Sequence, residues 1–143
     1  MLVRGACMGH LLWVADQPRV LVIDDHELVR KALRRHLEAA GCLVRGAKDG
    51  REGLAETLEW EPHVVIVDRR LPKLSGDDLA KLIMQQAKYP PGIIMLTGEP
   101  THSLGPMREI SRLFTKPVDF GELYAAMKPY LPMDGPPTDQ TER

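Results

Sequence analysis

Apolar and polar residues follow two different spacings along most of the chain. Short, nearly continuous apolar runs, which are typical of buried strands, occupy residues 19–25, 42–47, 63–68, 92–97 and 111–115. The run HVVIVD at residues 63–68 contains four consecutive β-branched residues, which indicates a strand that is covered on both faces. The sequence therefore predicts five strands, with the third one in the middle of a sheet.

Segments with the apolar spacing of an amphipathic helix separate these runs. Their ranges are 26–40, 50–60, 76–88 and 120–130. Ser75 and Asp119 stand just before the third and fourth of them, where such side chains cap helices. Gly41 and Pro62 follow the first two and end them. Because strands and helices alternate, we expect an α/β fold built on a doubly wound parallel sheet.

The segment between the last two strands departs from this pattern. Residues 99–110 contain Pro100, Gly105 and Pro106, which interrupt helical spacing. The sequence therefore favours a short or irregular helix at this place.

Length and composition are those of one globular domain. The chain has 143 residues, of which 43% are apolar and 27% are charged. We predict an N-terminal extension over residues 1–18, the folded domain over 19–131 and a disordered, proline-containing tail over 132–143. Trp13 and its apolar neighbours are expected to pack on the domain or to remain disordered, with a contact in a homodimer as the alternative.

Charge and cysteine content exclude several classes of function. The net charge of −1 leaves no broad basic field for nucleic acid or for an anionic membrane. No apolar run reaches the roughly 18 residues of a membrane span, so we expect a cytoplasmic protein. Cys7 and Cys42 have neither disulfide nor zinc-site spacing, and we expect Cys42 to be buried and inert.

Residues with ligating or reactive side chains follow the carboxyl ends of the predicted strands. In a doubly wound sheet these ends form one edge, where ligands bind. The residues expected there are Asp24, Asp25, Asp68, Thr97 and Lys116. Clustered carboxylates repel one another unless a cation binds them, and oxygen ligands suit Mg²⁺. A lysine and a hydroxyl beside such a metal favour phosphoryl transfer, with Asp68 as the nucleophile.

Four motifs on these elements resemble those of response regulator receiver domains, which share a chemotaxis-regulator-like fold. In chain order they are VLVIDDHELVRKAL, VVIVDRRLPKLSG, IMLTG and FTKP. The resemblance covers about residues 19–131. It implies a flavodoxin-like sheet with the strand order 2-1-3-4-5.

The resemblance also implies partners and a metal. Asp68 would accept a phosphoryl group from a phosphohistidine of a sensor kinase or of a histidine phosphotransfer protein. The signal would pass to a downstream output protein or to a missing effector domain. Asp25, with help from Asp24, would hold Mg²⁺ together with Asp68 and the backbone carbonyl of Arg70. Such a protein is no enzyme beyond its own phosphorylation and dephosphorylation.

Four further residues are assigned from the same resemblance. Thr97 and Lys116 would bind the phosphoryl group, and the peptide bond between Lys116 and Pro117 is expected to be cis. His26, which follows the acid pair, is expected to be a surface residue at the start of a helix and not a metal ligand.

One departure from the family pattern concerns the conformational switch. Leu113 occupies the position, three before the lysine, where the family usually has an aromatic residue, and Phe114 is one place later. We therefore expect the switch to run through residues 98–114 and not through an aromatic rotamer. Arg70 and Glu99 are expected to pair and to shield the acyl phosphate from water.

Two other functions stay open. One is a receiver-like protein-binding module that phosphorylation does not regulate, although the complete set of site residues argues against it. The other is a phosphohydrolase with an aspartate nucleophile. Such enzymes usually need a second acid soon after the nucleophile, and Arg69 and Arg70 occupy that place here.

Overall fold

One parallel sheet forms the centre of the molecule. The computed structural model describes residues 17–99 and 108–132. Within this part of the chain the sheet has five strands in the order β2-β1-β3-β4-β5. The strands are β1 (Arg19–Ile23), β2 (Leu43–Ala47), β3 (Val64–Asp68), β4 (Gly92–Thr97) and β5 (Arg112–Thr115). The predicted fold class and strand order are confirmed.

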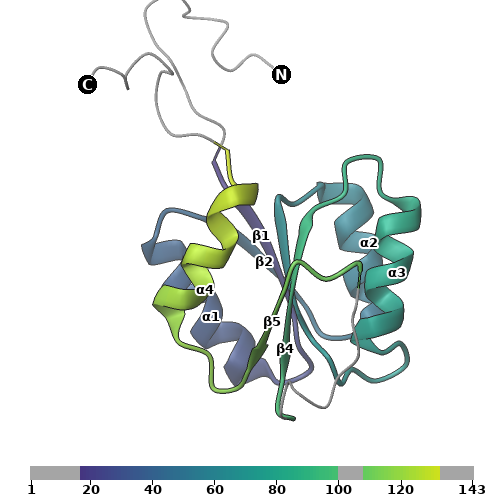
Figure 1. Ribbon diagram of the computed structural model, residues 1–143, viewed down its shortest axis with the longest axis horizontal. Helices are drawn as coiled ribbons and strands as arrows, with labels where there is room; N and C mark the ends of the chain where they lie inside the picture. Colours follow the sequence, from purple (N-terminus) through teal and green to yellow (C-terminus); the bar gives the residue numbers. More distant parts are fainter. Residues whose placement is uncertain (1–16, 100–107, 133–143) are drawn as a thin grey trace, which may run out of the picture.

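Helices cover both faces of the sheet. They are α1 (Glu27–Ala39), α2 (Gly50–Trp60), α3 (Gly76–Gln86) and α4 (Phe120–Met127), and the 3-10 turn η3 (Lys128–Tyr130) continues α4. Figure 1 shows α1 and α4 on one face and α2 and α3 on the other. A separate cluster of buried apolar side chains lies under each pair of helices. Since all five residues of β3 are buried, its predicted central position is confirmed.

The helix boundaries agree closely with the chemistry of the flanking residues. Ser75 Oγ accepts a hydrogen bond from the Asp78 N–H (3.2 Å), and the Asp119 carboxylate accepts one from the Glu122 N–H (3.0 Å). Gly41, just past α1, has a φ of 96°, a conformation that favours glycine. The third helix ends earlier than predicted, because the backbone is already extended at residue 87.

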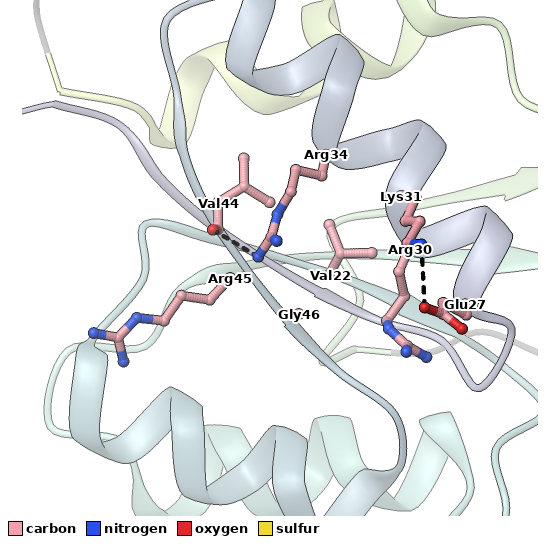
Figure 2. Close-up of a pocket in the computed structure, with 8 residues that line it drawn as sticks. All are labelled: Val22, Glu27, Arg30, Lys31, Arg34, Val44, Arg45 and Gly46. Atoms are coloured by element: carbon pink, nitrogen blue, oxygen red, sulfur yellow. Dashed lines mark hydrogen bonds and ion pairs between the residues drawn. The ribbon is translucent and has the colours of Figure 1, made fainter.

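Basic side chains of α1 lie along the outer edge of β2, as Figure 2 shows. Arg34 donates a hydrogen bond to the backbone carbonyl of Val44 (3.2 Å), and Lys31 forms an ion pair with Glu27 (3.2 Å). Charged side chains at a sheet edge hinder pairing with a strand of another molecule. Arg34 therefore occupies a backbone acceptor of the edge strand that another strand could otherwise use.

Some expectations fall on residues that the structure does not describe. Residues 1–16, 100–107 and 133–143 lie outside the described part of the chain. The N-terminal extension, most of the short or irregular helix expected within residues 99–110 and the tail therefore stay predictions. Cys42 is buried as expected, and burial raises the pKa of its thiol. Among the described helices, none combines the length and the apolar character needed to cross a bilayer.

Candidate functional site

The pairing of the strands brings the expected site residues to one edge of the sheet. Strands β1, β3 and β4 pair in a register that puts Asp24 level with Asp68 and Thr97 one residue further along. Lys116 directly follows β5, and its backbone N–H donates to the carbonyl of Thr97 (2.7 Å). Residues from four strand ends are thus neighbours although more than 90 residues separate the first from the last.

An acidic cluster is the centre of this edge. Asp24, Asp25, His26 and Asp68 each present one ligating atom, and these atoms all lie within 4.8 Å of one another. Asp24 and Asp68 are buried, whereas the side chain of Asp25 is 38% exposed. Two carboxylates therefore lie in a poorly solvated site, and the third faces water.

Lys116 is the cation that faces the two buried acids. Its Nζ lies 3.4 Å from Asp24 Oδ2 and 3.4 Å from Asp68 Oδ1. The peptide bond to Pro117 is cis. One ammonium group between two carboxylates leaves a net negative charge at the site.

The pKa of Asp68 depends on its burial and on the charges beside it. Burial raises the pKa of Asp68 above its usual range, and the nearby charge of Asp24 raises it further. Lys116 and a hydrogen bond from the Arg70 N–H to Asp68 Oδ1 (3.3 Å) act in the opposite direction and only partly offset the increase. A site that holds Asp68 in its charged form with difficulty is suited to an additional cation.

The donor set fits a hard divalent cation. Asp24, Asp25 and Asp68 supply carboxylate oxygens, the ligand type that Mg²⁺ prefers, and the exposed side of the cluster leaves room for water ligands. The backbone carbonyl of Arg70 as a further ligand stays a prediction.

His26 has contacts that the sequence did not indicate. It lies at the N-cap of α1 and is exposed, as expected. Its Nδ1, however, is 3.3 Å from Asp24 Oδ1 and 3.1 Å from Asp25 Oδ1. Its backbone N–H also donates to Asp24 Oδ1 (2.9 Å), so this residue helps to orient the buried acid.

Thr97 is buried at the end of β4. Its Oγ1 accepts a hydrogen bond from the backbone N–H of Glu99 (3.1 Å). The hydroxyl is therefore engaged with the loop that follows its own strand.

A group of ion pairs borders the acidic cluster. Arg70 pairs with Glu99, so the expected contact between these two side chains is present. Arg69 makes two contacts of 3.2 Å with the carboxylate of Asp77 and one of 3.3 Å with Glu99 Oε1. No local spacing in the sequence connects Arg69 to residues 8 and 30 positions away, so this role of Arg69 was not predicted.

A family model of the response regulator receiver domain matches residues 20–128. Among curated proteins, Protein PilG of Pseudomonas aeruginosa is 30% identical over 122 residues, which cover 82% of this chain and 90% of that protein. The alkaline phosphatase synthesis transcriptional regulatory protein PhoP of Bacillus subtilis is 34% identical over 116 residues, or 79% of this chain. The match covers only 48% of PhoP, and a methylesterase/glutaminase of Archaeoglobus fulgidus is matched over only 22% of its length.

Solved structures give the same result at the level of the fold. The chemotaxis response regulator CheY4 of Vibrio cholerae is 28% identical, with a TM-score of 0.71 over 81% of this chain and all of that one. A response regulator receiver domain from Clostridium thermocellum is 30% identical, with a TM-score of 0.71 over 79% of this chain and 93% of that one.

Proposed function

Because this chain belongs to the receiver-domain family of two-component response regulators, we propose that Asp68 accepts a phosphoryl group from a phosphohistidine of a partner protein. The observation that carries the proposal is the position of Asp68, buried between a second carboxylate and a lysine at the sheet edge. The partner is a sensor kinase or a histidine phosphotransfer protein in the cytoplasm. An output protein or an effector domain outside this chain reads the result.

The transfer is a nucleophilic substitution at phosphorus. One carboxylate oxygen of Asp68 forms a bond to phosphorus while the phosphorus–nitrogen bond to histidine breaks. The imidazole nitrogen keeps the electron pair of the broken bond. Lys116, already 3.4 Å from Asp68 Oδ1, neutralises part of the charge on the phosphoryl oxygens, and the Thr97 hydroxyl donates a hydrogen bond to one of them.

Asp24, Asp25 and Asp68 would hold Mg²⁺, which supplies further positive charge to the transferring group. Asp24 is kept in place by His26 and by Lys116. The burial of Asp24 and Asp68 limits the access of water to the nucleophile. We assign to these residues only the phosphorylation and dephosphorylation of this chain, and no turnover of another substrate.

An apolar groove beside the site is suited to the phosphohistidine-bearing partner. It has a volume of about 630 Å³ and lies between α1 and α4, next to Lys116 and Pro117. Leu28, on its wall, is 80% exposed. A partner that brings histidine to Asp68 must cover this edge, and a helix with an apolar face would bury Leu28 there.

The primary test is intact mass after treatment with acetyl phosphate and Mg²⁺. We expect one added phosphoryl group in the wild type, lost in base as acyl phosphates are, and none in Asp68→Ala. A label that persists in Asp68→Ala contradicts the assignment. If no group is added to the wild type, the alternative of a binding module without phosphorylation takes its place.

Leu28→Asp tests the groove. An aspartate is compatible with the first turn of a helix, so α1 should be kept. We expect transfer from a phosphohistidine-bearing partner to fall at least about tenfold, since burying an unpaired charge costs more than about 1.4 kcal/mol. Labelling by acetyl phosphate should stay at the wild-type rate. Equal loss with both donors would show damage to the site itself and not to docking.

A further inference from the structure

Four charged side chains connect three segments around the site. Arg69 and Arg70 follow β3, Asp77 lies in the first turn of α3, and Glu99 lies in the loop after β4. Arg69 contacts both Asp77 and Glu99, whereas Arg70 contacts Glu99. The residues just after β3, the start of α3 and Glu99, two residues after β4, are therefore held together by charge.

The two arginines differ in how firmly they are held. The side chain of Arg69 is 25% exposed, and its Nε and one terminal nitrogen each lie 3.2 Å from an Asp77 oxygen. Such a two-point contact fixes both the position and the plane of a guanidinium group. The side chain of Arg70 is 78% exposed. Exposed single ion pairs hold their partners weakly, so Arg69 is the stronger support for Glu99.

Glu99, which Arg69 holds, in turn contacts the hydroxyl of Thr97. The carboxylate of Glu99 is bound by Arg69, and its backbone N–H donates to Thr97 Oγ1 (3.1 Å). Thr97 is buried and has no bulk water to replace this donor. Movement of the hydroxyl away from its present place therefore requires the loss of the Glu99 contact.

We propose that Arg69, anchored by Asp77, is a positioning residue that holds Glu99 and thereby retains Thr97 in the unphosphorylated arrangement. The inference rests on the proposed function for its consequence, which is resistance to the movement of Thr97 toward a phosphoryl group on Asp68. A phosphoryl group carries up to about two negative charges and would compete with Glu99 for the nearby guanidinium groups. Phosphorylation then weakens the support of Glu99 and frees Thr97.

Amide hydrogen exchange at Glu99 tests the restraint without any phosphorylation. In the full chain without Mg²⁺, we expect the Glu99 amide to exchange about tenfold faster in Arg69→Gln, a factor that corresponds to about 1.4 kcal/mol. Asp77→Asn should act in the same direction although it removes the opposite charge, because it removes the anchor. Thr97→Val, which lacks the accepting oxygen, marks the upper limit of the effect.

Arg70→Gln is the matched control. It removes the same charge from the adjacent position and a contact with the same carboxylate, but it leaves the anchored arginine in place. We expect less than about a twofold change, as for an exposed ion pair. The proposal is overturned if the Glu99 amide exchanges in Arg69→Gln at the wild-type rate. It is also overturned if Arg69→Gln and Arg70→Gln change that rate equally.

The binding of beryllofluoride, an analogue of the phosphoryl group, in the presence of Mg²⁺ tests the predicted resistance to the movement of Thr97. Arg69→Gln and Asp77→Asn should bind it at least about threefold more tightly than the wild type, because less of the binding energy is used to release Thr97. Binding that is tight in the wild type but unchanged in both variants contradicts the restraint on switching. If the wild type binds no beryllofluoride, the proposed function fails, and amide exchange still decides whether Arg69 positions Glu99.

Discussion

Two features of the position of Asp68 disfavour its charged form in the unmodified protein. It is buried at the end of the central strand, where few water molecules reach it, and it lies beside Asp24. Both conditions raise its pKa, and the contacts from Lys116 and the Arg70 N–H reverse only a part of this effect. A nucleophile that is protected from water is thus obtained at a cost in folding stability.

The raised pKa of Asp68 makes the folding stability depend on pH. An unfolded aspartate has a pKa of about 3.9, and the folded pKa of Asp68 is higher, so the native state binds more protons between the two values. The contribution of Asp68 is most favourable below the unfolded pKa and is lost as the pH rises through the folded pKa. Without Mg²⁺, Asp68→Asn should therefore be more stable than the wild type at neutral pH, by a margin that shrinks toward pH 4.

Urea denaturation between about pH 4 and pH 8 measures that margin. Asp78→Asn, in the first turn of α3, is the control: loss of a negative charge near a helix N-terminus should slightly lower the stability at neutral pH. A stability difference between Asp68→Asn and the wild type that does not grow with pH would falsify the explanation by burial and repulsion.

At the scale of elements, α2 lies unusually close to β1. A Cβ atom on Gly53 would be 2.5 Å from Ile23 Cδ1, 3.1 Å from Cγ1 and 3.2 Å from Cγ2. Ile23 is fully buried, so a shift of its side chain would disturb the core around it. The absence of a side chain at Gly53 allows the helix to pack on the end of the strand that leads into Asp24.

Gly53→Ala should therefore destabilise the protein in spite of the better helix propensity of alanine. The higher helix propensity of alanine would add roughly 1 kcal/mol to the free energy of unfolding, while overpacking of a filled core lowers it by about 1–3 kcal/mol. We expect a net loss on the order of 1 kcal/mol in the free energy of unfolding. In Gly121→Ala, where the nearest atom is Asp119 Oδ2 at 3.4 Å, stability should be unchanged or higher. A Gly53→Ala protein as stable as Gly121→Ala would show that Ile23 repacks.

Strand β5 places its two apolar side chains on opposite faces. Leu113 packs with the cluster under α2 and α3, and Phe114 is buried in the cluster under α1 and α4. Neighbouring residues of a strand point to opposite sides, so Phe114 cannot take the place of an aromatic side chain at position 113. A switch without an aromatic rotamer stays a prediction, and it is compatible with a restraint that acts through Arg69 and Glu99.

At the scale of the whole molecule, the acidic edge should make folding depend on Mg²⁺. A cation between Asp24, Asp25 and Asp68 removes repulsion that exists only when the sheet has formed, so it binds the native state selectively. At about 100 times its dissociation constant, such a ligand adds roughly 2.7 kcal/mol to the free energy of unfolding.

Thermal denaturation with and without Mg²⁺ measures this effect. The melting temperature of the wild type should rise, and that of Asp25→Ala should rise much less. Asp119→Ala, which removes a carboxylate at the start of α4, lowers stability but should keep the full response to Mg²⁺. An equal increase in the wild type and in Asp25→Ala would argue for non-specific binding of the ion.

Local patterns indicated the fold class and the residues that would lie together at one edge of the sheet, whereas the strand order followed from the resemblance to receiver domains. Continuous apolar runs identified the five strands, because strands inside the sheet are covered on both faces. Helical spacing identified the four helices, because each buries only one face. The rule that ligands bind at the carboxyl ends of parallel strands then placed Asp24, Asp68, Thr97 and Lys116 at one edge. The motifs they lie in indicated the family.

Tertiary structure decided what each of these side chains contacts. Asp24 and Asp25 are adjacent and chemically identical, yet one is buried beside Lys116 and the other faces water. Arg69 is adjacent to Arg70 and has the same charge, yet it alone has an anchor in Asp77. Burial and ion pairing depend on differences of a few ångströms between segments that are distant in the chain. The periodicity of the sequence determines which face a residue occupies, but it does not determine those distances.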